Sequence, residues 1–132
     1  MKIDSLWLWR LILPTVLLVS ASVSHAIGLG DVVVRSSLDA PFLAEINLLS
    51  VRADELDTLR ASLAPDSDFR RAAIERVEIL DNLVFRPFLR DDGSAMVQVT
   101  SPKPFTEPYL NFLVMLEWTG GRIVREYTVL LD

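Results

Sequence analysis

The 132-residue sequence contains few side chains of the types that usually carry out catalysis. It has no cysteine, and its single histidine is His25. Thiolate and imidazole are the commonest nucleophilic, acid–base and metal-binding groups. A chain cut after Ala26 would lack both groups, which excludes serine–histidine and cysteine–histidine mechanisms. The Gly28-Leu29-Gly30 run is not a dinucleotide-binding motif, because it lacks the third glycine and precedes a predicted strand instead of a helix.

Acidic residues offer two other kinds of chemistry. A pair of carboxylates can hydrolyse a glycosidic bond, and Glu117 and Glu126 flank one predicted hairpin. Arg122 and Arg125 stand in the same hairpin, so cross-strand ion pairs are the better interpretation of these acids. Residues 91–94, Asp-Asp-Gly-Ser, are too few for a calcium loop, which spreads its oxygen ligands over about twelve residues. We therefore predict no catalytic residue, no cofactor and no metal ligand, and we expect the protein not to be an enzyme.

The strand predicted over residues 109–118 carries the strongest candidate for a binding surface. On one face every second residue from Leu110 to Trp118 is apolar, with Phe112 in the middle, which predicts a core stripe. The opposite face is more apolar than a solvated surface requires. It includes a tyrosine, a residue type that often fills interface pockets. The predicted partner-binding face consists of Tyr109, Asn111, Leu113 and Met115.

Most of the segments that would position this face have the pattern of β-strands. Residues 32–34 are all valine, and a branched Cβ favours extended backbone. Between Ala53 and Ile74 the apolar residues recur at spacings of three and four, which is typical of helices, and Pro65 divides this segment into two short helices. The predicted strands cover residues 31–36, 43–49, 77–89, 95–101, 109–118 and 122–131.

Together these elements predict a mainly β fold. The Asp92-Gly93 pair predicts a two-residue hairpin turn, which needs positive φ at its central residues, and residues 119–121 predict a second hairpin. Strands and helices do not alternate as they do in parallel α/β folds, and no repeat is detectable. We predict an antiparallel β-sandwich, immunoglobulin-like or a partly closed barrel, of about six strands with a short two-helix insertion.

The first 26 residues have the three parts of a secretory signal peptide. Two basic residues give a positive start, residues 11–19 are almost entirely apolar, and small residues precede a predicted cleavage site after Ala26. A membrane-spanning helix needs about 18 or more apolar residues, so this run is too short for an anchor. We predict a signal peptide over residues 1–26 and one exported domain over residues 27–132.

The charge of the sequence argues against a polyanionic partner. The chain carries 13 basic and 18 acidic residues, a net charge of −5 at pH 7. Removing the signal segment takes away two basic residues and one acidic one, which makes the charge more negative. Nucleic acids and anionic membranes attract proteins through concentrated positive charge. We therefore expect no nucleic-acid partner, and contact with a membrane only through the signal segment before cleavage.

Several sequence blocks resemble the periplasmic N-terminal domain of the FimV/TspA family. The blocks cover both ends of the predicted domain, and the last of them, which ends in REYTVLLD, is specific. They are residues 26–31 (AIGLGD), 35–41 (RSSLDAP), 44–46 (AEI), 99–104 (VTSPKP), 107–114 (EPYLNFLV) and 121–132 (GRIVREYTVLLD). The resemblance extends over essentially the whole mature chain.

This resemblance implies a periplasmic module of an inner-membrane hub that supports type IV pilus assembly, twitching motility and the placement of machinery at the cell pole. The expected partners are envelope or pilus-assembly proteins, with peptidoglycan involved indirectly, and the family offers no catalytic residues to carry over. The expected location is the periplasm, or the inner membrane if the signal segment is not cleaved. Full members also carry a peptidoglycan-binding LysM domain, a membrane span and an acidic cytoplasmic part. The chain is therefore expected to be a fragment of a hub or a separate copy of its first domain.

Two other functions stay open at the level of sequence. Exposed acids on a β-sandwich would suit a small carbohydrate-binding, peptidoglycan-binding or glycan-cleaving domain. A long free edge strand would suit a chaperone that accepts a donated strand. Saturable binding to peptidoglycan fragments would separate the first of these alternatives from a protein-binding module.

Overall fold

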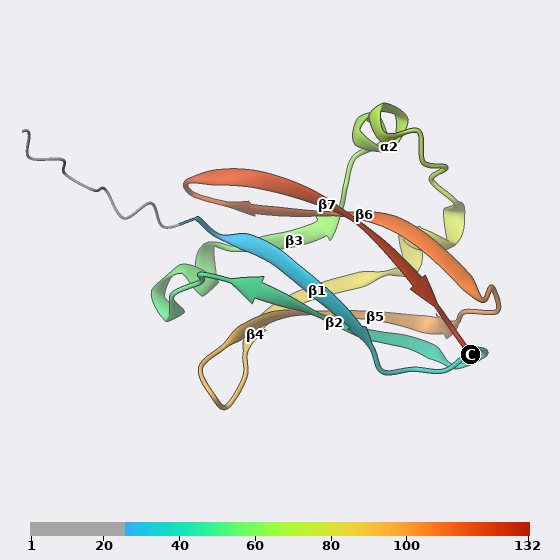
Figure 1. The fold of residues 1–132 in the computed structure, drawn as a ribbon, viewed down its shortest axis with the longest axis horizontal. Coiled ribbons are helices and arrows are strands. Elements are labelled where there is room, and N and C mark those ends of the chain that lie inside the picture. Colours follow the sequence, from blue (N-terminus) through green and yellow to red (C-terminus); the bar gives the residue numbers. More distant parts are fainter. Residues whose placement is uncertain (1–25) are drawn as a thin grey trace, which may run out of the picture.

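Two antiparallel β-sheets pack face to face in the computed structural model, which describes residues 26–132 (Figure 1). The elements in chain order are β1 (Gly28–Val34), β2 (Pro41–Leu49), the 3₁₀-helix η1 (Ala53–Thr58), β3 (Arg60–Leu63), α2 (Asp66–Ala72), the 3₁₀-helix η2 (Glu78–Asn82), β4 (Val84–Leu89), β5 (Ala95–Pro104), β6 (Tyr109–Trp118) and β7 (Gly121–Leu130). The strand order is β1-β2-β5-β4 in the four-stranded sheet and β3-β6-β7 in the three-stranded sheet.

The core lies between the two sheets and follows the alternation of apolar residues. β2 buries every second residue from Phe42 to Leu48, and β6 does so from Leu110 to Leu116. Phe112 is fully buried in the middle of β6, as predicted. Alternating burial of this kind is typical of sheets that pack through one face. The predicted antiparallel β-sandwich is confirmed, with seven strands instead of six.

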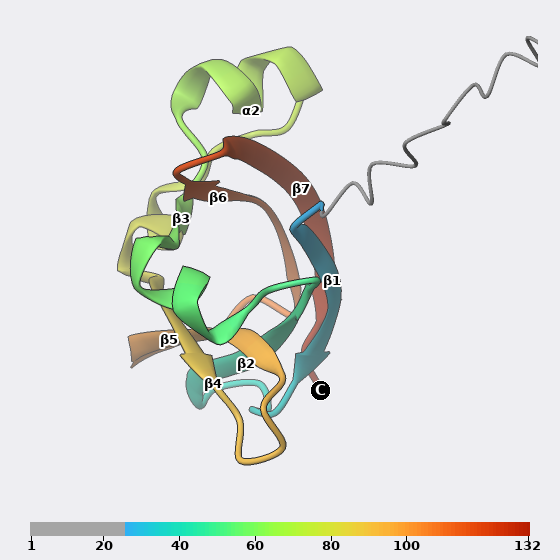
Figure 2. The ribbon, with the colours of Figure 1, turned by 90° about the vertical axis from the view of Figure 1, so that its left-hand side faces the viewer.

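Neighbouring strands also bring the two sheets together along both long edges of the sandwich (Figure 2). β1 of the larger sheet lies beside β7 of the smaller one, and β3 lies beside β4. The Tyr127 hydroxyl on β7 donates a 2.7 Å hydrogen bond to the backbone carbonyl of Gly30, and Arg125 Nη1 donates one of 2.9 Å to the carbonyl of Leu29. The fold therefore has the character of a partly closed barrel as well as of a sandwich.

Glycine is required at position 30 because β1 and β2 approach closely there. The register of the two strands shifts between Leu29 and Val32, which is the mark of a β-bulge. A Cβ at Gly30 would lie 2.9 Å from the carbonyl oxygen of Asn47. The bulge also brings the Gly30 carbonyl to the Tyr127 hydroxyl. Burial raises the pKa of Tyr127 from 10.0 to about 12, because the charged phenolate would lose its water.

The segment predicted as two short helices contains one α-helix and an unpredicted strand. After η1, Arg60–Leu63 forms β3 and pairs with β6. The first predicted helix therefore exists only as η1 over Ala53–Thr58, and the helical interpretation of the spacing was wrong from Leu59 to Leu63. A 3₁₀ turn followed by a short strand produces the same spacing, and pairing with β6 satisfies the backbone groups that a helix would have satisfied. The second predicted helix is confirmed as α2, with Pro65 at its N-cap.

The hairpin between β4 and β5 has a longer turn than the Asp-Gly pair predicted. The Arg90 N–H donates to the Ser94 carbonyl at 2.8 Å, and the Gly93 N–H donates to the Arg90 carbonyl at 3.0 Å. Gly93 has a φ of 86°, so a type I turn followed by a left-handed glycine closes the loop. Hydrogen bonds from the hydroxyl and the amide of Ser94 hold the pKa of the Asp92 carboxyl below its usual value.

The remaining differences between the predicted and the observed elements lie at the ends of segments. The strand predicted from residue 77 begins at Val84, because η2 occupies the start of that segment. The predicted signal peptide, residues 1–26, lies outside the described residues except for Ala26. Within the described residues, no helix has the length and apolar character needed to span a bilayer.

Candidate functional site

The outer face of β6 carries the four residues predicted to bind a partner, and the structure separates them into two groups. Tyr109 is 56% exposed, and Asn111 beside it is partly buried. Leu113 is only 4% exposed and belongs to the core cluster, and Met115 is partly buried against that cluster. Tyr109 therefore lies at the surface and Leu113 in the packed interior, whereas Asn111 and Met115 are both partly buried.

Helix α2 lies over the outer side of the three-stranded sheet and explains this burial (Figure 2). Phe69 of α2 is 1% exposed, and Asp68 forms an ion pair with Arg122 of β7. Arg122 Nε in turn lies 2.9 Å from the sulfur of Met115. The part of the sheet that holds Leu113 and Met115 is therefore occupied by the protein's own side chains and is not free for a partner.

Local sequence chemistry fixes both ends of α2 and the path of the chain after it. Asp66 in the first turn places negative charge where the helix amides lack partners, which is favourable. At the other end Ala73 has a φ of 57°, and the Ile74 N–H donates to the Phe69 carbonyl at 3.0 Å. This bond and the left-handed residue are typical of a helix C-terminus. They turn the chain so that residues 74–79 run beside the start of β6.

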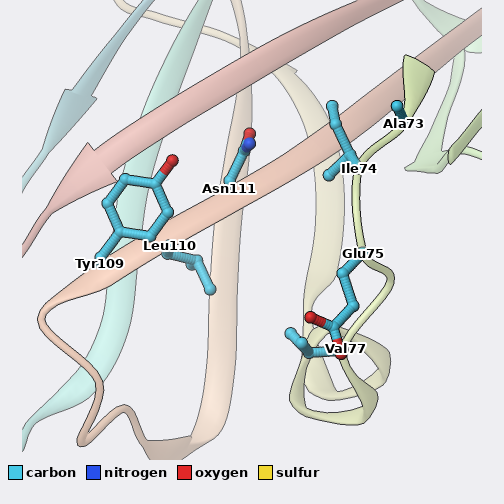
Figure 3. A pocket seen from close by; sticks show the side chains of 7 residues that line it. All are labelled: Ala73, Ile74, Glu75, Val77, Tyr109, Leu110 and Asn111. Carbon is cyan, nitrogen blue, oxygen red and sulfur yellow. The ribbon is translucent and has the colours of Figure 1, made fainter.

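Residues 73–79 and the start of β6 enclose a surface groove (Figure 3). It consists of two adjoining hollows of about 320 and 410 Å³, which share Val77, Tyr109 and Leu110 as lining residues. Figure 3 shows the Tyr109 ring and the Asn111 amide on one side of β6 and Leu110 on the other. We name this feature the Tyr109 groove, defined by Ile74, Glu75, Val77, Glu107, Tyr109 and Asn111.

Exposed apolar side chains gather at the Tyr109 groove. Six large apolar residues are exposed in the described part of the chain. Two of them, Val77 at 38% and Tyr109 at 56%, line the groove, and a third, Leu130 at 73%, is the strand neighbour of Tyr109. Leu130 is the register partner of Tyr109 across β6 and β7, so both side chains are on the same face of the sheet. A cluster of exposed apolar residues is more informative than single ones, which are common on protein surfaces.

Acidic side chains flank this apolar surface. Glu75 lines one hollow and Glu107 lines the other. Neither takes part in the ion pairs formed among the described residues. The nearest arginine in sequence, Arg76, is held by Asp66 at 3.0 Å and by Asp81 at 2.6 Å. The groove therefore presents negative charge that these neighbours do not neutralise.

Asn111 adds a polar atom to the groove. Its Oδ1 is buried and accepts no hydrogen bond from the described residues. Buried polar atoms in proteins nearly always have a hydrogen-bond partner, and leaving one unpaired costs free energy. A donor on a bound molecule would relieve that cost.

The prediction of ion pairs across the β6–β7 hairpin is wrong. The register places Glu117 opposite Arg122, but the Arg122 guanidinium turns to Asp68 on α2. Arg125 pairs with Asp31 on β1 at 3.3 Å. Both arginines pair with carboxylates from segments distant in sequence instead of those across the hairpin. The local sequence could not indicate these partners.

The same register argues against a glycosidase site at these acids. Glu126 stands opposite Leu113, four residues along β6 from Glu117. At about 3.4 Å per residue, their backbone positions are about 14 Å apart along the strand, whereas the carboxyl groups of glycosidase pairs are about 5–9.5 Å apart. No three histidine, cysteine, aspartate or glutamate side chains in residues 26–132 form a group that could hold a metal ion.

Sequence reasoning found one wall of the Tyr109 groove and missed the other. Tyr109 and Asn111 were predicted from the alternation of β6, whereas Ile74, Val77 and Glu107 come from other segments. The signal for the second wall was a set of apolar residues within a highly charged stretch, residues 74–82. Their place beside β6 depends on the end of α2, which strand periodicity does not describe.

Two antiparallel sheets that pack face to face through alternating apolar residues define an immunoglobulin-like β-sandwich domain. The family model described as the FimV N-terminal domain, an Ig-like domain, matches residues 27–132. The chain belongs to this family, and the resemblance to FimV/TspA proteins is confirmed.

Relatives of known name support the same membership. The motility hub protein FimV of Pseudomonas aeruginosa, in strains PAO1 and UCBPP-PA14, is 43% identical to this chain over 113 residues. The aligned part is 86% of this chain and 12% of the relative, so the chain spans a small fraction of the length of these hub proteins. No solved structure matches the chain.

Proposed function

We propose that this chain is a non-catalytic periplasmic module that contributes to type IV pilus assembly, twitching motility and polar organisation of the envelope through protein contacts. The observation that carries the proposal is the family match over residues 27–132, which covers the whole sandwich. The identity of 43% with a protein named as a motility hub supports it. The proposed partners are envelope or pilus-assembly proteins, with peptidoglycan involved indirectly.

The arrangement of side chains favours contact over catalysis. Two exposed apolar residues, Val77 and Tyr109, line the Tyr109 groove, and a third, Leu130, lies next to Tyr109 on β7. Glu117 and Glu126, the acids considered for glycan cleavage, are four residues apart in register. A strand-accepting chaperone needs a free sheet edge, whereas β1 lies beside β7 and β3 beside β4.

The family match also supports the proposed export. It begins at Ile27, directly after the predicted cleavage site, so we propose that residues 1–26 are removed and that the periplasmic form starts at Ile27. Mass spectrometry of the periplasmic fraction measures the N-terminus. An intact Met1 in the membrane fraction would contradict cleavage and make the protein an anchored domain.

Domain exchange tests the proposed function. The corresponding domain of P. aeruginosa FimV is either deleted or replaced by residues 27–132 of this chain, and twitching zones are compared with those of the unmodified strain. We expect the deletion to reduce twitching and the replacement to restore it, with immunoblots as the control for equal protein levels. A deletion strain that twitches normally, or an exported replacement that restores nothing, would overturn the proposal.

The alternative from another class is a peptidoglycan-binding or glycan-cleaving domain. Titration of the purified domain with peptidoglycan fragments tests it directly. Saturable binding, or cleavage lost on mutation of an acid pair, would favour this alternative over protein contact.

A further inference from the structure

We infer that the Tyr109 groove binds an extended protein segment that inserts an apolar side chain next to lysine or arginine. This inference rests on the proposed function, because it takes the partner to be a protein. It assigns the contact to one place on the domain and gives the partner a chemistry.

The apolar part of the groove would hold the inserted side chain. Val77 and Tyr109 are exposed and line both hollows. Ile74, which is partly buried, lines one of them, and Leu130 extends the apolar surface onto β7. A partner side chain that enters here would remove several apolar groups from water at once, which favours association. Tyrosine is a common anchor at the centre of such contacts.

The charge of the groove selects a cationic partner. Glu75 and Glu107 lie in the two hollows and belong to no ion pair of the described residues. Arg76, which could have neutralised them, is engaged by Asp66 and Asp81. Opposite charge across a contact speeds association and fixes its register.

The same charges argue against a second copy of this chain as the occupant. Two copies that met groove to groove would bring the acids of each toward the acids of the other, and the chain carries a net charge of −5. Facing like charges weaken association. A lysine- or arginine-bearing segment of a different protein removes this penalty.

Asn111 supplies a hydrogen bond for the backbone of the segment. Its buried Oδ1 has no partner among the described residues, and an extended segment carries a backbone N–H at every residue except proline. Because this oxygen is buried in the free domain, an N–H of the segment would reach it only once the amide turns toward the groove, and the bond would then place the inserted side chain beside Tyr109.

Selection from a displayed library of random peptides, each about a dozen residues long, tests the inference. The bait is residues 27–132, which contain both sheets and the whole described core. Enriched peptides are sequenced, and their binding is measured by fluorescence anisotropy at low and high salt. We expect lysine or arginine beside leucine, phenylalanine or tryptophan, and weaker binding at high salt, because salt screens exposed charges.

Substitutions locate the binding. Tyr109→Ala should weaken the selected peptides about tenfold, and Glu75→Gln combined with Glu107→Gln should weaken them mainly at low salt. Two matched controls should bind like the unmodified domain. Val84→Ala removes a side chain of similar exposure, 55%, on β4, and Glu117→Gln removes an exposed acid at the far end of β6.

Three results would overturn the inference: no enrichment, enrichment of acidic or uncharged peptides, or equal binding by the Tyr109→Ala domain. Twitching assays separate this outcome from failure of the proposed function. Full twitching by a groove variant that has lost peptide binding would reject the groove and leave the proposed function intact. Normal twitching after deletion of the domain would reject the proposed function whatever the peptides show.

Discussion

The outer face of the three-stranded sheet has a covered part and an open part, although both lie on the same strand. Around Leu113 and Met115, α2 packs against the sheet and buries Phe69. Around Tyr109 and Asn111 the chain passes to one side and leaves a groove. The difference teaches that alternation along a strand identifies its two faces, whereas the cover on each face is decided by a segment far away in sequence.

The largest loss of stability is expected from a substitution on the inner face of β6. It gives the value against which substitutions in the covered and open parts are compared. Phe112→Ala removes a fully buried ring and leaves a cavity, so we expect the free energy of unfolding to fall by about 3–5 kcal/mol. Domains of this size are stabilised by about 5–15 kcal/mol in total. Urea unfolding followed by circular dichroism measures the loss. A loss within about 0.5 kcal/mol, as for a surface residue, would show that β6 does not pack between the sheets.

The next effect tests the covered part. Phe69→Ala should lower the free energy of unfolding by about 3 kcal/mol, because the 1% exposed ring joins α2 to the core. Arg70→Ala, on the exposed side of the same helix, is the matched control in the same urea titration. Equal stabilities for the two variants would mean that α2 opens independently and that the covered part is not covered in solution.

A smaller effect, with a pH signature, is expected where β7 meets β1. Tyr127→Phe leaves the Gly30 carbonyl without its donor and should cost about 1–2 kcal/mol. The folded-state pKa of about 12 lies above the ordinary 10.0, so the stabilisation from the neutral ring is complete below pH 10.0 and is lost as pH rises toward 12. Thermal melts between pH 8 and pH 11 compare the two proteins, with the values of pH chosen around the ordinary pKa.

The pH comparison has a clear contrary result. The Tyr127→Phe protein should lose less stability than the unmodified protein as pH passes 10.0, because it has no phenol at this position to titrate. Identical pH profiles would show that the hydroxyl is solvated and that β1 and β7 are not joined there.

The smallest effect on stability tests the open part. Tyr109→Ala should change the free energy of unfolding by no more than about 0.5 kcal/mol, because the ring is 56% exposed. Association with the partner should nevertheless weaken, as measured by co-purification. If the Tyr109→Ala domain melts at as low a temperature as the Phe112→Ala domain, the Tyr109 ring is part of the core. The outer face would then have no open part.

Strands with clear alternation could be predicted from sequence, and the strand that lacks it could not. β6 covers residues 109–118 as predicted, because a full apolar stripe alternates along it. β3 has only four residues, Arg60–Leu63, with one exposed and three partly buried. Its extended conformation depends on pairing with β6, some fifty residues away in the chain, and no local period reports that pairing.

The candidate site shows the same limit. Tyr109 and Asn111 could be placed on a surface because they share a strand. Val77 could not be joined to them, since that step requires the left-handed turn at Ala73 that redirects the chain after α2. Glu107 lies in the loop just before β6, where no strand alternation gives the direction of a side chain. The burial of Leu113 has a similar origin, because it depends on where α2 settles.

The position of β1 beside β7 also sets how the domain would respond to mechanical force. The two strands run in the same direction, and the described chain enters at the start of β1 and leaves at the end of β7, at opposite ends of the long axis (Figure 1). Tension between Ile27 and Leu131 would therefore slide the strands past each other lengthwise. The Tyr127–Gly30 and Arg125–Leu29 hydrogen bonds would be loaded together in shear instead of being peeled apart one by one. Resistance to pulling is set by the barrier to unfolding, and we expect the contacts at the junction of the two sheets to contribute to that barrier.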